Sequence, residues 1–263
     1  EERPGKGNAV RRAFLEVDAD IYILADADMT YPAAQVHQLM SPVITGEADM
    51  VVGDRHSTGH YAAENKRPLH GFGNRLVRDL VNKLFKADLA DIMSGYRVFN
   101  RRFVKSYPIL VEGFELETDM TLHALDKRFR IVEIPVEYRD RPAGSFSKLN
   151  TLRDGTRVLS TIGNILRYYR PLMFFGSAAA VFFILGLIAG VPVIAEWFTV
   201  QYISHVPLAI LAVGFETFAI VLSAIGLILD SMRHQGKQGF EQDLLMHEIT
   251  GQDGPKRQPF MRR

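Results

Sequence analysis

Two aspartates, Asp26 and Asp28, are the first residues of this sequence whose types and spacing could do chemistry. They follow an apolar run, 21–25, that has the pattern of a buried strand. Because a strand projects residues i and i+2 to the same side, both carboxylates are expected to face one hard cation at a sheet edge. Mg²⁺ and Mn²⁺ take oxygen ligands and commonly share them with substrate phosphates. The sequence therefore predicts a divalent metal site here, with an acidic turn that binds no metal as the alternative.

The composition separates this chain from several classes of protein. It has 263 residues, a formal net charge of +1 and no cysteine. The near-neutral charge gives no signature of nucleic-acid binding, and the absence of cysteine excludes a disulfide framework and a thiolate metal site. A mean hydropathy of 0.00 beside 23% charged residues indicates that a polar part and a very apolar part are segregated along the chain.

The apolar part consists of two long segments, 171–195 and 206–229. The first has no charged side chain, and the second has only Glu216. A spanning helix needs about 20 mostly apolar residues, so the two segments predict a transmembrane hairpin. A buried helix pair in a soluble protein is the alternative. Lys and Arg flank the outer ends but are absent from the loop at 196–205, which predicts that the polar domain and both termini lie in the cytoplasm.

The polar part has the pattern of alternating strands and helices. Short apolar runs predict strands at 21–25, 49–53 and 131–138. Amphipathic spacing predicts helices at 8–17, 32–43, 71–85 and 115–127. Residues 91–99 have a mixed pattern and are expected to form a loop. This alternation predicts an α/β sandwich around a mixed, mostly parallel sheet, in which ligands bind beyond the carboxyl ends of the strands.

Several short motifs occur in the order in which family 2 glycosyltransferases carry them. The motifs are Gly5–Gly7, Ala25–Asp28, Gly53–Arg55, Asp91–Arg97, Glu115–Asp119, Arg141–Thr151 and Asp154–Gly155. On these motifs the chain resembles family 2 glycosyltransferases of the GT-A fold, most closely the polyprenyl-phosphate hexosyltransferases that include dolichol-phosphate mannose synthase. Many bacterial members of that group also carry a carboxy-terminal membrane hairpin. The resemblance covers roughly residues 5–229 and implies a Rossmann-like GT-A domain.

The resemblance also implies roles for individual residues. Catalytic roles fall to Asp28, Asp91 and Asp119. Substrate binding falls to Lys6, Asp26, Arg55, Arg67, Arg97, Glu117, Arg141, Ser147 and Lys148. Asp28 is the implied ligand of an Mg²⁺ or Mn²⁺ ion on the nucleotide-sugar diphosphate, where a divalent ion stabilises the charge of the leaving group. Asp26 is its implied partner and reaches the nucleotide ribose or the metal. Arg55 and Arg67 are implied to hold the acceptor phosphate, which suits the planar fork of an arginine.

Structural alternatives exist for the basic residues of this set. Solvated surface charge is the alternative for Arg55 and Arg67. The loop that contains Arg141, Ser147 and Lys148 is implied to close over the reaction site and engage phosphates. Attraction of this basic stretch to anionic lipid is compatible with that role and is its alternative.

The acids Asp91 and Asp119 receive no firm role from the sequence. In other family 2 enzymes, an acid at about the position of Asp119 removes the proton from a sugar hydroxyl. A lipid phosphate needs no such base, because the second pKa of a phosphomonoester is about 6 and the group is already anionic at neutral pH. With a phosphate acceptor we expect these acids to orient the sugar or to assist metal binding. Salt-bridged structural acids are the alternative.

Together these observations predict an inverting, metal-dependent transferase that moves a hexose from a nucleotide sugar to a polyprenyl phosphate. The expected donor is GDP-mannose, UDP-glucose or UDP-N-acetylglucosamine, and the expected acceptor is a dolichyl or undecaprenyl phosphate at the cytoplasmic membrane face. One rival is a family 2 transferase that acts on a lipid or polysaccharide hydroxyl, with Asp119 as its base. The other is a non-catalytic membrane scaffold with a decayed transferase domain, against which the intact Asp26 and Asp28 argue.

The predicted organisation has four parts. They are a GT-A domain at 1–148, an amphipathic juxtamembrane segment at 149–170, two transmembrane helices within 171–232 and a cytoplasmic tail at 233–263. Compared with the family, the first strand-helix unit is expected to be missing before Gly5, so the domain is predicted to be N-terminally incomplete. The small residues at 176–180 allow close helix packing and make a homo-oligomer a further candidate assembly.

Overall fold

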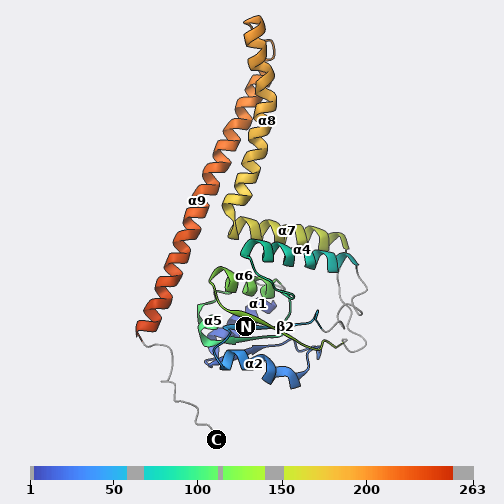
Figure 1. Ribbon diagram of the computed structural model, residues 1–263, viewed down its shortest axis with the longest axis vertical. Coiled ribbons are helices and arrows are strands. Elements are labelled where there is room, and N and C mark those ends of the chain that lie inside the picture. The colour runs from blue at the N-terminus through green and yellow to red at the C-terminus, as the bar shows by residue number, and fades with distance from the viewer. Residues whose placement is uncertain (1–2, 58–67, 112–114, 140–150, 251–263) are drawn as a thin grey trace. The chain divides into compact units, whose positions relative to one another are not determined.

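The computed structural model describes residues 3–57, 68–111, 115–139 and 151–250 (Figure 1). The chain divides into two compact units, 1–159 and 160–263. The first contains a sheet with helices on its faces, and the second contains two long apolar helices. Each unit is described by itself below.

The sheet of the first unit has four strands in the order β1-β3-β2-β4. These are β1 (Ile21–Leu24), β2 (Met50–Asp54), β3 (Arg97–Asn100) and β4 (Ile131–Pro135). β2 and β4 pair in parallel, whereas β3 pairs antiparallel with both β1 and β2. The prediction of a mixed sheet is confirmed, but the prediction that it is mostly parallel is wrong for these pairings. The difference arises because the segment expected to be a loop at 91–99 supplies an interior strand that runs against both of its neighbours.

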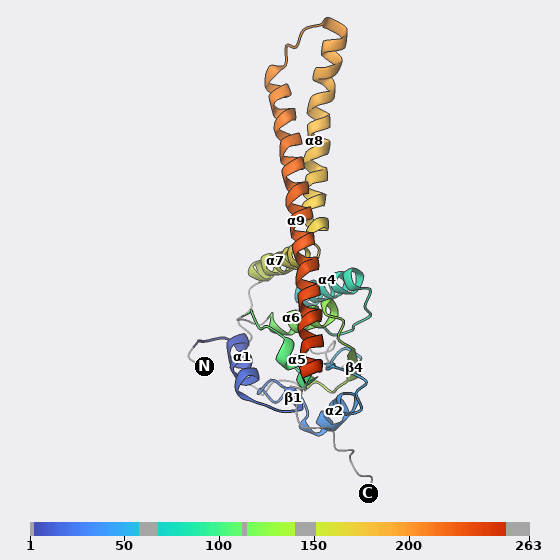
Figure 2. The ribbon, with the colours of Figure 1, turned by 90° about the vertical axis from the view of Figure 1, so that its left-hand side faces the viewer.

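Helices cover both faces of this sheet. They are α1 (Lys6–Glu16), η1 (Ala33–Gln35), α2 (Val36–Ile44), α4 (Pro68–Phe85), α5 (Arg101–Ser106) and α6 (Leu116–Asp126). Figures 1 and 2 place α2 on one face and α6 on the other. Leu39 of α2 packs in a core cluster with Val51 and Val98. On the opposite face, Arg97 donates to Thr121 of α6. Because side chains of a strand alternate between faces, β3 serves both layers.

The second unit contains two helices that are long and apolar enough to cross a membrane by length and composition, α8 (Pro171–Val200) and α9 (Val206–Thr250). They run side by side (Figure 2). Both continue beyond the apolar segments seen in the sequence. α7 (Thr151–Tyr169) precedes them and contains the boundary between the two units.

Small residues fill the contact between α8 and α9. Ala179 and Ala189 of α8 and Ala212 and Ala219 of α9 are all buried. An acid also lies in this contact. A Cβ added at Gly186 would lie 2.8 Å from the Cδ of Glu216, so a larger residue would make that side chain shift. The Glu216 side chain therefore lies against the backbone of α8, at a position where a glycine allows close approach.

Candidate active site

The two aspartates lie just beyond the carboxyl end of β1, as predicted, but not on the strand itself. β1 ends at Leu24, and the chain then enters a turn in which Met29 has a positive φ of 63°. Asp28 Oδ1 accepts the Thr30 backbone N–H at 3.2 Å and the Thr30 hydroxyl at 2.6 Å. An aspartate that bonds to the backbone two residues on stabilises a turn. Strand alternation therefore does not apply to Asp26 and Asp28, because a turn replaces the strand at this point, and their sharing of one cation stays a prediction.

Three of the predicted site residues meet at one ion-paired cluster. The Lys6 ammonium, at the start of α1, donates to Asp26 Oδ1 at 2.5 Å and also to Glu117 Oε1 in the first turn of α6. Burial lowers the pKa of Lys6, but the two carboxylates outweigh it and hold the pKa above its ordinary value. Lys6 is therefore charged at neutral pH, and it ties the turn after β1 to α6.

Gly95 lets Asp26 approach the backbone of the segment before β3. A Cβ at position 95 would lie 3.0 Å from the Cγ of Asp26 and closer still to one carboxylate oxygen. The backbone N–H of Gly95 also donates to the hydroxyl of Tyr31 at 3.1 Å. We call residues 90–96 the central loop. The C-terminal end of this loop is thus held against the segment that carries the two aspartates.

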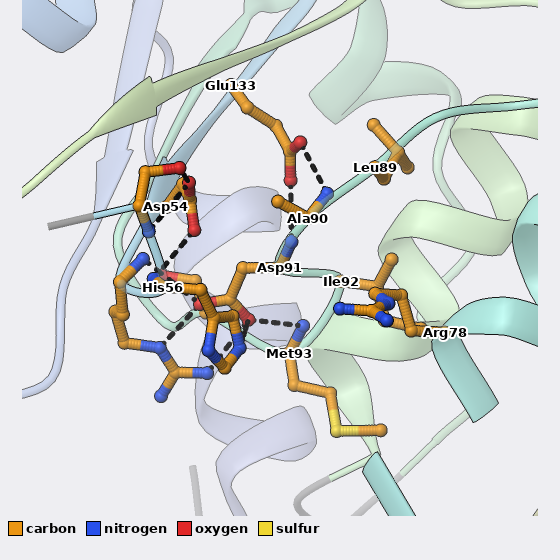
Figure 3. A network of polar contacts seen from close by, with 12 residues as sticks. Asp54, His56, Arg78, Leu89, Ala90, Asp91, Ile92, Met93 and Glu133 are labelled. Carbon is orange, nitrogen blue, oxygen red and sulfur yellow. Dashed lines mark hydrogen bonds and ion pairs between the residues drawn. The ribbon is translucent and has the colours of Figure 1, made fainter. Parts of the chain in front are cut away.

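The start of the central loop holds a buried ion pair (Figure 3). Arg55 Nε donates to Asp91 Oδ2 at 2.6 Å, and Arg55 Nη2 donates to Asp91 Oδ1 at 2.9 Å. The exposed fractions of these side chains are 11% for Arg55 and 1% for Asp91. Burial alone raises the pKa of Asp91, but hydrogen bonds and charge from Arg55, with a contribution from His56, lower it below its ordinary value. The pair is therefore ionised and bidentate, with Asp91 buried and part of the Arg55 side chain still exposed.

The Arg97 side chain is enclosed by protein groups, and its implied role in substrate binding stays a prediction. Its side chain is 0% exposed. Nε and Nη2 donate to the backbone carbonyls of Ser94 and Ile92, each at 2.8 Å, and Nη1 donates to the Thr121 hydroxyl at 2.9 Å. Through these bonds, Arg97 fixes the backbone of the central loop.

Asp119 lies two residues after Glu117 on α6 but bonds to a different partner. The hydroxyl of Tyr107 donates to Asp119 Oδ2 at 2.6 Å. Burial raises the pKa of Asp119, the hydrogen bond from Tyr107 lowers it, and the charge of Glu115 raises it again, so that the net pKa is above its ordinary value. A carboxylate with a raised pKa is a better proton acceptor.

Sequence reasoning missed three residues that hold this site together. Tyr31 receives the Gly95 N–H, and Asp54 receives the backbone N–H of His56 at 2.7 Å. Glu133 of β4 accepts the backbone N–H groups at the start of the central loop. A signal for Glu133 is present in the sequence, because it is the only acid in the apolar run Ile131–Val136.

Four of the predicted residues, Arg67, Arg141, Ser147 and Lys148, lie outside the part of the chain that the structure describes. Within that part, no group of three or more His, Cys, Asp or Glu side chains could hold a metal ion by itself. Asp26 and Asp28 offer carboxylate oxygens at partly exposed positions. This donor set fits Mg²⁺ or Mn²⁺, which commonly use one or two carboxylates and complete their shell with water and substrate phosphates.

Comparison with known proteins fixes the family. Residues 1–107 match the family model described as glycosyl transferase family 2. The chain is 30% identical over 227 residues to glycosyltransferase AglJ of Haloferax volcanii, a match that covers 86% of this chain and 74% of the relative. The chain belongs to glycosyl transferase family 2. The resemblance seen in the motifs is thereby confirmed.

Other relatives of this family 2 transferase carry more specific names. It is 28% identical over 174 residues to the undecaprenyl-phosphate mannosyltransferase of Micrococcus luteus, with 63% of this chain and 68% of that protein covered. Among solved structures it is similar to glucosyl-3-phosphoglycerate synthase of Mycobacterium tuberculosis, with a TM-score of 0.46 and 22% identity. That match covers 63% of this chain and 55% of the other, so the chain spans about half the length of that structure.

Proposed function

We propose that this family 2 transferase is a membrane-anchored, inverting hexosyltransferase that uses a nucleotide sugar as donor and a polyprenyl phosphate as acceptor. One observation carries the proposal. The central loop joins the carboxylates after β1, through Gly95 and Asp26, to the buried Arg55–Asp91 pair. The carboxylates after β1 suit a divalent cation and a donor diphosphate. The guanidinium of the Arg55–Asp91 pair suits an anionic acceptor.

Named relatives support a phosphate acceptor. The chain is 28% identical over 151 residues to the dolichyl-phosphate beta-glucosyltransferase of Saccharomyces cerevisiae. The Micrococcus luteus relative is named for undecaprenyl phosphate. The hexose and its nucleotide differ among such relatives, so GDP-mannose, UDP-glucose and UDP-N-acetylglucosamine are all candidate donors.

The mechanism assigns distinct tasks to the residues of the two places. Asp28 and Asp26 would hold Mg²⁺ or Mn²⁺, which supplies charge stabilisation to the departing diphosphate when it is bound. Lys6 keeps Asp26 oriented through its ion pair. Arg55 holds the acceptor phosphate, one of whose oxygens attacks the anomeric carbon from the side opposite the leaving group and so inverts the configuration. That oxygen is already anionic, and no side chain has to remove a proton.

The membrane part of the proposal rests on α8 and α9. Their apolar surfaces are widely exposed, as in Val181, Ile188, Ile210 and Ile220. Water does not favour such surfaces and a bilayer does. We place the catalytic unit and both ends of the chain on the cytoplasmic side, where Lys and Arg flank the two helices. The helices would keep the active site close to a lipid acceptor.

A transfer assay tests the proposed function directly. Membranes that contain the protein are incubated with Mn²⁺, undecaprenyl phosphate and each of the three labelled donors in turn. We expect label to enter the organic-extractable lipid with one donor, and we expect this to fail with Asp28→Asn. Label that enters polymer or a hydroxyl lipid instead, with none on the added lipid phosphate, would contradict the proposed acceptor.

The raised pKa of Asp119 favours a second candidate, transfer to a hydroxyl with Asp119 as the base. The variant Asp119→Asn separates the two. With a phosphate acceptor, Asp119→Asn keeps substantial turnover and loss of Arg55 is severe. With a hydroxyl acceptor, Asp119→Asn loses about 10²–10⁴-fold, the usual contribution of general acid–base catalysis. Steady-state rates of the two variants in the same membranes give the answer.

A further inference from the structure

Glu133 is a partly buried acid that the proposed mechanism leaves without a task. It lies in the middle of β4. Its Oε2 accepts the backbone N–H of Ala90 at 2.7 Å, and its Oε1 accepts the backbone N–H of Asp91 at 2.8 Å. Figure 3 shows both bonds at the start of the central loop. Both oxygens of one carboxylate are therefore engaged by two consecutive peptide groups.

Glu133 holds the backbone of Asp91, and the side chain of this same aspartate pairs with Arg55. The Asp91 side chain makes the bidentate pair with Arg55, and its Oδ1 also accepts the Met93 N–H at 3.2 Å. The Arg55 guanidinium lies 5.6 Å from the centroid of the Tyr138 ring. Asp91 thus sets the position of the Arg55 guanidinium. A shift of the Asp91 backbone would therefore move this guanidinium.

We propose that Glu133 is a positioning residue for the acceptor phosphate, because it fixes the backbone that aims Asp91 at Arg55. The inference rests on the proposed function, which gives Arg55 a phosphate as its ligand. A carboxylate suits this position, since it offers two acceptor oxygens to two donors. A glutamine has one oxygen, and its amide would point N–H groups at one of the two peptide N–H groups.

A double-mutant cycle tests this relay. The dissociation constant for undecaprenyl phosphate in detergent micelles is measured for the wild type, Glu133→Gln, Arg55→Ala and the double variant. Undecaprenol, the same lipid without phosphate, serves as the matched ligand. Arg55→Ala is expected to weaken phosphate binding by about tenfold or more, as for the loss of charged hydrogen bonds. Glu133→Gln alone is expected to weaken it severalfold, with no further effect once Arg55 is gone.

A structural control comes from the opposite end of β2. Asp49 is buried and accepts the Arg130 backbone N–H at 2.9 Å and the Asn100 side-chain amide at 2.8 Å. It accepts more hydrogen bonds than Glu133, including two from the Arg130 guanidinium, but it lies at the end of β2 away from Arg55. Asp49→Asn is expected to lower the unfolding temperature while the preference for undecaprenyl phosphate over undecaprenol stays unchanged.

Two results would overturn the inference. If Glu133→Gln weakens phosphate binding by the same factor with and without Arg55, it acts by general destabilisation. If Arg55→Ala binds undecaprenyl phosphate like the wild type, the proposed role of Arg55 fails, and the inference about Glu133 fails with it. Should Glu133→Gln not fold, the cycle is run with Glu133→Asp, which keeps the charge but has a shorter reach; wild-type affinity in that variant contradicts the relay.

Discussion

Each of the two units has a glycine that makes room for a carboxylate, but the surroundings of the two acids differ. Gly95 receives Asp26 in the catalytic unit, and Gly186 receives Glu216 between α8 and α9. Asp26 is paired with Lys6. Glu216 lies in a groove with apolar residues such as Leu187 and Val213.

The difference shows that a carboxylate packed against a glycine can have different roles in the two units. Around Asp26, Lys6 comes from α1 and Gly95 from the central loop, so the acid joins elements that are far apart in the sequence. Among the described residues, those that line the groove around Glu216 belong to the two adjacent helices α8 and α9. We infer that the first acid works through its charge, whereas the second mainly occupies space in the helix contact. The predictions below test that contrast.

The largest effect is expected from Asp28→Asn, which removes charge beside Asp26. Loss of a group that stabilises charge in a transition state costs about 10²–10³-fold in rate. Transfer of label to undecaprenyl phosphate is measured in membranes with matched amounts of protein. Glu216→Gln is the control and is expected to keep nearly wild-type transfer. If the two variants lose activity equally, the contrast between the units is wrong.

Gly95→Ala is expected to lose activity without unfolding the catalytic unit. The new Cβ displaces the Asp26 carboxylate, and a misplacement of 1 Å at a reaction site costs on the order of 10²-fold. Transfer rate and thermal unfolding are measured together. Adding Asp26→Ala removes the clash but should not restore transfer, because the carboxylate itself is required. Restored transfer in that double variant would show that Asp26 has only a structural role.

Gly186→Ala should behave differently, because space is the limiting quantity between α8 and α9. The added methyl is expected to destabilise the helix pair by about 1 kcal/mol, at the low end of overpacking effects, because the Glu216 side chain can shift. Glu216→Ala in the same chain should relieve the clash and restore the unfolding temperature in detergent. A double variant that is less stable than Gly186→Ala would contradict the packing role.

The smallest effect is a pH dependence of stability that comes from the Arg55–Asp91 pair. The folded pKa of Asp91 lies below its ordinary value, so its contribution is fully present above the unfolded value of about 3.9 and is lost as pH falls through the folded pKa. Urea unfolding of the wild type and Asp91→Asn is compared at neutral and acidic pH. The difference between their unfolding free energies should shrink on acidification. A difference that is the same at every pH would contradict the ion pair.

The sequence alone predicted the parts of this molecule that depend on local pattern. The apolar run before Asp26, the family motifs and the two long apolar segments led to the α/β class, the location of the acids and the helix pair. β3 was missed because its buried apolar pair, Val98 and Phe99, stands between the polar residues Arg97 and Asn100, whereas the four residues of β1 are all apolar. A short apolar pair of this kind does not distinguish a strand from a loop.

Side-chain partners could not be predicted, because they depend on the tertiary fold. Lys6 and Glu117 are 111 positions apart, and no spacing rule brings them together. Arg97 has the type and position of a phosphate ligand, but only the fold reveals that its side chain is enclosed. The partner of Asp28, in contrast, is local, because the Asp-x-Thr sequence that forms its turn is visible in the chain.

The central claim is that a lipid phosphate, oriented by Arg55, receives the sugar. The most direct measurement is mass spectrometry of the lipid product formed by membranes supplied with an equal mixture of undecaprenyl phosphate and undecaprenol. We predict hexose on undecaprenyl phosphate, none on undecaprenol, and loss of the product in Arg55→Ala. Hexose on undecaprenol, or an Arg55→Ala product that matches the wild type in amount, would contradict the claim.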